Sequence, residues 1–312
     1  MKKLLLAAAF SVSAVAAYAQ DWTPPGPVKL MIAFAAGGGA DTQARLIAEE
    51  LEARMGWQFI PEQVTGKGGI NLAMAMKDMP ADGTAIGMVV TETMGYNMVA
   101  ADAGITPDDF TQIATTAGFQ MGVVAPSSKG WTSFSDVIDA AKAGEDIRFG
   151  TMSPKLSDLA YLMGKANGVD FNIVQVRGGR AVMDGVNAGD MDLGFMAGIQ
   201  AKGVAAGDLV NLASALSVPL NQTPDAPTMA DLGVEFVADG YFLFAGPAGM
   251  PDAARDALAS AIEAVVTDEE TKAGALIKRA FGGASVFTGD ELDALVAGDY
   301  AAAGALLEAA SE

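Results

Sequence analysis

The chain contains no cysteine and no histidine. Without cysteine it can form no disulfide, use no thiol nucleophile and carry no lipid on a thiol. Without histidine it lacks the commonest metal ligand in proteins and the side chain that most often acts as a base near neutral pH. These two absences exclude most hydrolase triads, and we expect neither a metal site nor a cofactor.

Positive charge is also scarce. The 312 residues include 19 lysines and arginines against 38 aspartates and glutamates, a formal net charge of −19. An acidic protein repels nucleic acid and anionic membrane surfaces, so neither is expected as a partner.

The first 19 residues have the features of a secretory signal peptide. Two lysines follow the initiating methionine, residues 4–17 form an apolar run, and Ala17-Tyr18-Ala19 supplies small residues at a cleavage site. The run is too short for an ordinary membrane span. We therefore predict cleavage after Ala19, export to the periplasm and no membrane insertion of the mature chain, whose net charge is 17 − 38 = −21.

One stretch near the mature N-terminus has the pattern of a binding site. An apolar run at residues 28–34 ends in Gly37-Gly38-Gly39 and continues into a helical pattern at residues 43–55. Unpaired backbone N–H groups at such a helix start favour a carboxylate or phosphate. The spacing matches neither the dinucleotide fingerprint nor the P-loop. The alternative is a tight turn that only lets strand and helix pack closely.

This strand, loop and helix pattern recurs along the chain. Further strands are predicted at 57–60, 84–90, 119–126, 147–150, 172–176 and 192–196, with an extended segment at 235–245, and helices at 71–78, 134–143, 156–166, 181–188, 252–266, 268–280 and 290–310. The alternation predicts an α/β fold with parallel sheets and ligands beyond the carboxyl ends of the strands. About 290 mature residues are more than one small core holds, so two lobes are expected.

Several motifs in their order resemble those of the periplasmic solute receptors of tripartite tricarboxylate transporters, the Bug family. They are Phe34-x-x-Gly37-Gly38-Gly39-x-Asp41, the Gly66-to-Gly69 loop, Pro80-x-Asp82-Gly83, Arg177-Gly178-Gly179 and Pro247-Ala248-Gly249-Met250-Pro251. The resemblance covers nearly all of the mature chain.

The resemblance implies a two-lobed periplasmic binding protein of the type II-like class, in which each lobe is a mainly parallel sheet flanked by helices. The ligand cleft lies between the lobes, here residues 20–122 plus 240–312 and residues 123–239, with strands crossing near 119–125 and 235–244. It further implies a monomer that captures a small organic anion, a di- or tricarboxylate, and delivers it to membrane permease subunits. The family holds the carboxylate with backbone N–H groups and ordered waters at glycine loops.

Four cations stand at positions where the family carries other residues, and we predict that they face the cleft. Lysine acts as a point charge on a carboxylate, whereas a guanidinium pairs with it bidentately. The alternative is that they are solvated charges or rim ion pairs. The full set of predicted ligand contacts is Phe34, Gly38, Gly39, Asp41, Lys67, Gly68, Thr91, Thr93, Thr151, Ser153, Lys155, Arg177, Gly178, Gly179 and Arg180, of which Lys67, Lys155, Arg177 and Arg180 are the four cations.

Other assignments stay open at this point. Asp41 could meet a ligand or serve the start of a helix, and Phe34 could stack on a ligand, although packing is favoured. Glu92 could accept a cationic group, but pairing with Lys67 is favoured. An enzyme is disfavoured because no nucleophile and base are found together, while a ligand-sensing receptor of a signalling system would use the same binding chemistry as a transport receptor.

Overall fold

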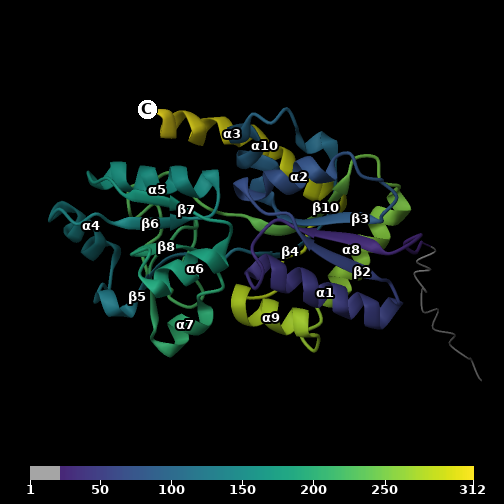
Figure 1. Ribbon diagram of the computed structural model, residues 1–312, viewed down its shortest axis with the longest axis horizontal. Coiled ribbons are helices and arrows are strands. Elements are labelled where there is room, and N and C mark those ends of the chain that lie inside the picture. The colour runs from purple at the N-terminus through teal and green to yellow at the C-terminus, as the bar shows by residue number, and fades with distance from the viewer. Residues whose placement is uncertain (1–21) are drawn as a thin grey trace, which may run out of the picture.

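The computed structural model describes residues 22–312, so the predicted signal peptide and its cleavage site lie outside the described residues. Two lobes lie side by side, each built on one five-stranded sheet with helices around it (Figure 1).

The first sheet has the strand order β2-β1-β3-β10-β4. Its strands are β1 Val28–Ile32, β2 Phe59–Gln63, β3 Ala85–Val90, β4 Phe110–Gly118 and β10 Tyr241–Pro247. β1 pairs in parallel with β2 and β3, whereas β10 runs antiparallel to both of its neighbours. Four strands therefore point one way and only β10 is reversed.

The second sheet repeats this plan in the order β7-β6-β8-β5-β9. It consists of β5 Met121–Pro126, β6 Arg148–Thr151, β7 Asn172–Gln175, β8 Leu193–Ala197 and β9 Leu209–Ser214. Here β5 is the reversed strand, antiparallel to β8 and β9, while β6 is parallel to β7 and β8. The predicted fold class, two lobes with mainly parallel sheets, is confirmed.

Helices cover both faces of each sheet, which is why the central strands are apolar without alternation. All six residues of β3 are buried, as expected for a strand packed on both sides. The first lobe carries α1 Gly39–Met55, α2 Ile70–Met76, α3 Met98–Ala101, α8 Asp252–Val266, α9 Lys272–Phe281 and α10 Gly289–Ser311, with the short turns η1 Lys67–Gly69, η2 Thr93–Asn97 and η3 Pro107–Asp109. The second carries η4 Ser127–Lys129, α4 Phe134–Lys142, α5 Pro154–Asn167, α6 Gly179–Ala188 and α7 Ala201–Ala206.

The helix α10 belongs to both lobes. Its first half packs against β4 and η2, and its C-terminal half reaches α5 of the second lobe, where the chain ends (Figure 1). Ala303 and Leu306 are buried in that second half.

The predicted strand at 119–126 was wrong in its extent. β4 ends at Gly118 in the first sheet and β5 begins at Met121 in the second, so Phe119 and Gln120 form the crossing between lobes. β4 was missed because it is rich in polar residues. Their hydroxyls are satisfied by residues distant in sequence, since Thr116 Oγ1 donates to Gln43 at 2.7 Å and Thr115 Oγ1 to the Ser285 carbonyl at 2.8 Å.

Three other predictions differ from the structure. The segment 235–245 is a strand only from Tyr241 onward, the second crossing being irregular before it. α7 and β9 were not predicted, and residues 91–93 begin a helical segment where a strand-end loop was expected. The exact residue limits of the two lobes stay predictions. Met121 and Gly122, which were assigned to the first lobe, pair with β8 and so belong to the second sheet.

In the second lobe the buried carboxylate of Asp192 is held by two partly exposed cations, Lys129 and Arg148. Asp192, 4% exposed at the start of β8, accepts hydrogen bonds at 2.9 to 3.0 Å from the backbone and guanidinium of Arg148, and Lys129 Nζ lies 2.6 Å away. Burial alone would raise the pKa of Asp192, but the hydrogen bonds from Arg148 and Lys129 outweigh it and lower the pKa to about 2.

Asp192→Asn should lower the free energy of unfolding by about 2 kcal/mol near pH 7, because it removes the charge that the two cations share. A carboxylate whose pKa is lowered by folding contributes stability above its unfolded-state pKa and loses it as pH falls toward the folded value. The deficit should therefore shrink between pH 4 and about pH 2, measured by urea unfolding.

The control is Asp184→Asn, which breaks the exposed pair with Arg180 and should cost about 0–1 kcal/mol. Equal losses for the two variants, or a deficit that does not change with pH, would contradict the assignment.

Candidate functional site

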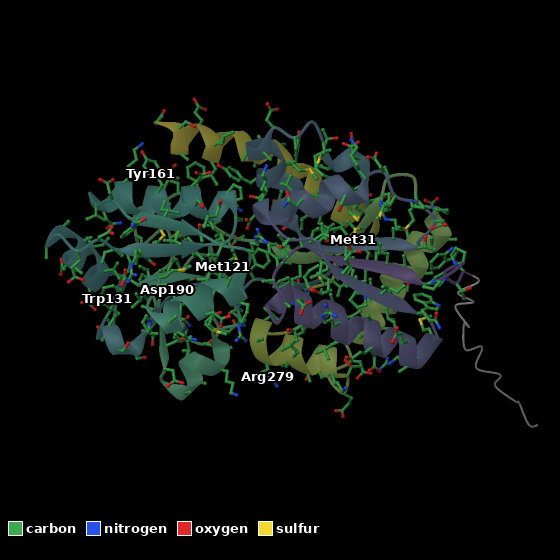
Figure 2. The ribbon with its side chains drawn as sticks, in the orientation of Figure 1. Met31, Met121, Trp131, Tyr161, Asp190 and Arg279 are labelled. Atoms are coloured by element: carbon green, nitrogen blue, oxygen red, sulfur yellow. The ribbon has the colours of Figure 1, made fainter. Side chains whose placement is uncertain are left out.

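A cavity of about 50 Å³ lies between the lobes, more than a single buried water needs. Its walls come from both sheets and are mostly apolar, and Figure 2 shows Met121 near the junction of the lobes. The lining consists of Phe34, Gly38, Gly39, Ala40, Val90, Glu92, Phe119, Met121, Met152, Ser153, Leu156, Gly179, Ala197, Ile199 and Phe242.

Three helices begin at this cavity. α1 starts at Gly39 from the first lobe, while α5 follows Ser153 and α6 starts at Gly179 from the second. No described side chain caps α1 or α6; the Ala181 N–H of α6 already donates to the Gly178 carbonyl, whereas the N–H groups of Gly39 and Gly179 have no side-chain partner. Unpaired donors and aligned peptide dipoles give each start a partial positive charge, which makes the cavity attractive to an anion.

The lobes are closed on each other by polar contacts. The Ala35 N–H donates to the Arg177 carbonyl at 2.9 Å, Ser153 Oγ donates to Glu92, and the Lys155 N–H donates to Asn97 Oδ1 at 3.3 Å.

Gly178 is required where the two backbones meet. Its φ is +126°, and a Cβ there would stand 3.0 Å from the Ala35 nitrogen. A side chain at this position would hold the lobes apart.

Tyr96 and Asp158 form a further contact across the lobes. The hydroxyl of Tyr96, on η2, donates to the carboxylate of Asp158, on α5. Burial raises the pKa of both groups; the hydrogen bond adds to the rise for Tyr96 and partly offsets it for Asp158. The phenol of Tyr96 therefore stays protonated at neutral pH, and its hydroxyl donates a hydrogen bond to Asp158 of the other lobe.

Five of the fifteen predicted contacts line the cavity, namely Phe34, Gly38, Gly39, Ser153 and Gly179. Gly68, Thr91, Thr93 and Thr151 are also buried and form hydrogen bonds within the protein. Thr93 Oγ1 donates to the Gly68 carbonyl at 2.8 Å, Thr91 Oγ1 accepts from the Tyr241 N–H at 3.1 Å, and the Thr151 and Ser157 hydroxyls share a hydrogen bond of 2.8 Å.

The four cations are not brought into the cavity. Lys67, Arg177 and Arg180 are exposed, and Lys155 is half-buried beside a neighbouring cavity. Arg180 lies on the first turn of α6, where its guanidinium reaches Asp184 one turn later at 2.8 Å. These positions agree with the alternative interpretation of the cations as solvated charges or ion pairs at the rim. Contact between their side chains and a ligand stays a prediction.

Two carboxylates have clear partners. Asp41 accepts from the Gly37 N–H and from Arg45 Nε, both at 2.8 Å, so it serves the start of α1. The favoured pairing of Glu92 with Lys67 was wrong, because Glu92 accepts from Ser153 and Asn97 instead. Glu92 is 5% exposed and lines the cavity. Its place directly after β3 was the sequence signal for this role.

Fold and site together define a two-lobed solute-binding protein. Residues 43–305 match the family model described as the tripartite tricarboxylate transporter family receptor, and the chain belongs to that family. The predicted resemblance is confirmed. In the described range 22–312 no helix is both long and apolar enough to cross a membrane, and no three acidic side chains gather in a way that could hold a metal ion.

Individual relatives agree with this placement. Protein BugT of Bordetella pertussis is 26% identical over 251 residues, 73% of this chain and 73% of its own. The periplasmic binding protein BugD superposes with a TM-score of 0.80 at 21% identity, over 93% of this chain and 99% of its own. MatC from Rhodopseudomonas palustris with bound malate superposes with a TM-score of 0.78 at 20% sequence identity. The superposition covers 91% of this chain and 99% of MatC. The structural likenesses show the shared fold.

Tyr96→Phe should weaken ligand binding about fivefold, because the closed form loses a hydrogen bond of about 1 kcal/mol and leaves the half-buried Asp158 without that donor. Isothermal titration with a ligand that binds the wild type measures the loss.

Tyr161→Phe is the matched control, since Tyr161 lies on the outer side of α5 and is 37% exposed. If both variants bind like the wild type, the Tyr96 contact does not stabilise closure.

Proposed function

We propose that this chain is a periplasmic solute-binding receptor, exported by the segment cleaved after Ala19, that captures a small organic carboxylate between its lobes and delivers it to the permease subunits of a tripartite tricarboxylate transporter. The observation that carries the proposal is the convergence of α1, α5 and α6, from both lobes, on one buried cavity. Membership of the receptor family supports it.

In this proposal backbone amides form the anion site. The starts of α1 and α6 lie at the cavity, and Gly38, Gly39 and Gly179 let a carboxylate approach their backbone N–H groups without a side chain in the way. Met152, Leu156, Phe119 and Phe242 provide apolar walls for the carbon skeleton. Binding needs contacts to both lobes, which is how a ligand favours the closed form over the open one.

The predicted cations act at longer range. Lys67, Arg177 and Arg180 stand on the loops around the cavity and are exposed. On a mature chain of net charge −21 they provide local positive potential where an anion must enter. We expect a monomer without catalytic activity, because each step of capture needs only the two lobes of one chain.

Carboxylates should raise the melting temperature of the mature protein, since a ligand that binds only the folded state stabilises it. A thermal-shift screen of mono-, di- and tricarboxylates, with neutral sugars and amines as negative controls, identifies the ligand. Small-angle scattering should then show a smaller radius of gyration with that ligand. Stabilisation by sugars alone, or no change of radius on binding, would contradict the proposal.

Gly179→Leu should abolish binding while leaving the fold intact. The atoms nearest to an added Cβ belong to Met152 and Ile199, at 3.6 and 3.7 Å, and both residues line the cavity that the larger side chain would fill. Titration calorimetry and thermal unfolding measure the two effects.

Gly298→Leu is the control, because Gly298 lies in α10 with nothing within 4 Å of a Cβ. Undiminished affinity in Gly179→Leu would place the ligand elsewhere.

A further inference from the structure

The inter-lobe cavity has a negative side chain in its wall. Glu92 is the one ionisable residue among those that line it, within the described part of the chain, and it is 5% exposed. A ligand that faces a buried carboxylate has to provide a hydrogen-bond donor or a positive charge for it, because an unpaired charge out of water costs free energy.

Only half of this carboxylate is satisfied by the protein. Oε1 accepts from Ser153 Oγ across the lobes and from Asn97 Nδ2 at 3.4 Å. No residue in the range 22–312 donates to Oε2. Oε2 is therefore left to accept a hydrogen bond from what enters the two adjoining cavities whose walls Glu92 shares.

The charged neighbours of Glu92 do not neutralise it. Lys155, Asp299, Glu235 and the Tyr96 hydroxyl surround the adjoining cavity, whose wall Glu92 shares. Burial raises the pKa of Asp299, and the charge of Lys155 acts on that carboxyl to offset part of the rise. Within the described chain no ion pair joins Lys155 to Glu92, and the Tyr96 hydroxyl already donates to Asp158. A ligand dianion with one end at the helix starts would bring a second carboxylate against Glu92.

We propose that Glu92 determines specificity by binding a cationic hydrogen-bond donor, so that the ligand is a small carboxylate whose other pole is an ammonium group. The proposal rests on the proposed function and narrows it. In this arrangement the helix starts bind the carboxylate of the ligand and Glu92 Oε2 accepts hydrogen bonds from its ammonium group. The apolar walls between them contact the methylene chain. Repulsion at Glu92 selects against plain dicarboxylates, and discrimination by an unfavourable contact is how such sites reject isosteres.

The test compares ligands that differ only in one end group. β-Alanine and succinate, and γ-aminobutyrate and glutarate, are pairs in which an ammonium replaces a carboxylate; butyrate supplies an uncharged end. Isothermal titration of the mature wild type should give at least about tenfold tighter binding for the amino member of one pair, because a desolvated charge pair replaces a repulsive one.

Glu92→Gln keeps an acceptor for Ser153 and so leaves closure in place, but it removes the charge. It should reduce the preference for the ammonium ligand by about tenfold or more. Glu145→Gln, at an exposed position after α4, should leave the preference unchanged.

Three outcomes overturn the inference. If dicarboxylates bind the wild type as tightly as their amino partners and Glu92→Gln changes nothing, Glu92 does not select the ligand, while the carboxylate receptor stands. If a dicarboxylate binds with uptake of one proton, measured in buffers of different ionisation enthalpy, Glu92 acts as a neutral donor. If no carboxylate of any kind binds, the proposed function fails and the inference fails with it.

Discussion

The backbone hydrogen bond from Ala35 to the Arg177 carbonyl sets how closely the lobes approach, and the remainder of the site depends on that distance. It joins the loop before α1 to the loop before α6, so one contact brings two helix starts to the same cavity. Gly178 makes the approach possible because any side chain there would meet the Ala35 nitrogen. The glycines of this protein thus serve the meeting of two backbones as much as the anion itself.

The positive potential at the site comes from the peptide dipoles of the helix starts. The charged side chain in the cavity wall, Glu92, contributes negative potential instead. The mature chain is strongly acidic, the exposed Lys67, Arg177 and Arg180 are not part of the cavity lining, and the side-chain charge in the wall is that of Glu92. Helix starts attract a carboxylate without adding a mobile cation that would need its own counterion. Such a site distinguishes the two ends of a ligand, because attraction and repulsion lie on different parts of its wall.

Local patterns were enough to predict the fold. Apolar runs identified β1 and β3, and the glycine loops predicted helices close to the starts of α1 and α6, since these features depend on neighbouring residues. β4 escaped because its polar side chains find partners in Gln43 and Ser285, far away in sequence. The partners of two charged side chains were also missed. Glu92 accepts a hydrogen bond from Ser153, 61 positions later in the sequence, and Arg180 forms an ion pair with Asp184 on its own helix. The sequence predicted the glycine loops before α1 and α6, but not the helical conformation of residues 91–93 or the partners of the side chains.

The helix α10 spans both lobes, which bears on how the protein can move. In the C-terminal half of α10, which reaches α5, the segment Ala301-Ala302-Ala303-Gly304-Ala305 has only short side chains, and Leu306 is the larger buried residue. Two helices in smooth contact can slide past each other without unlocking interdigitated rows. Opening would then combine rotation at the two chain crossings with shear along α10, and this sliding contact keeps the lobes aligned about one axis instead of letting them twist freely.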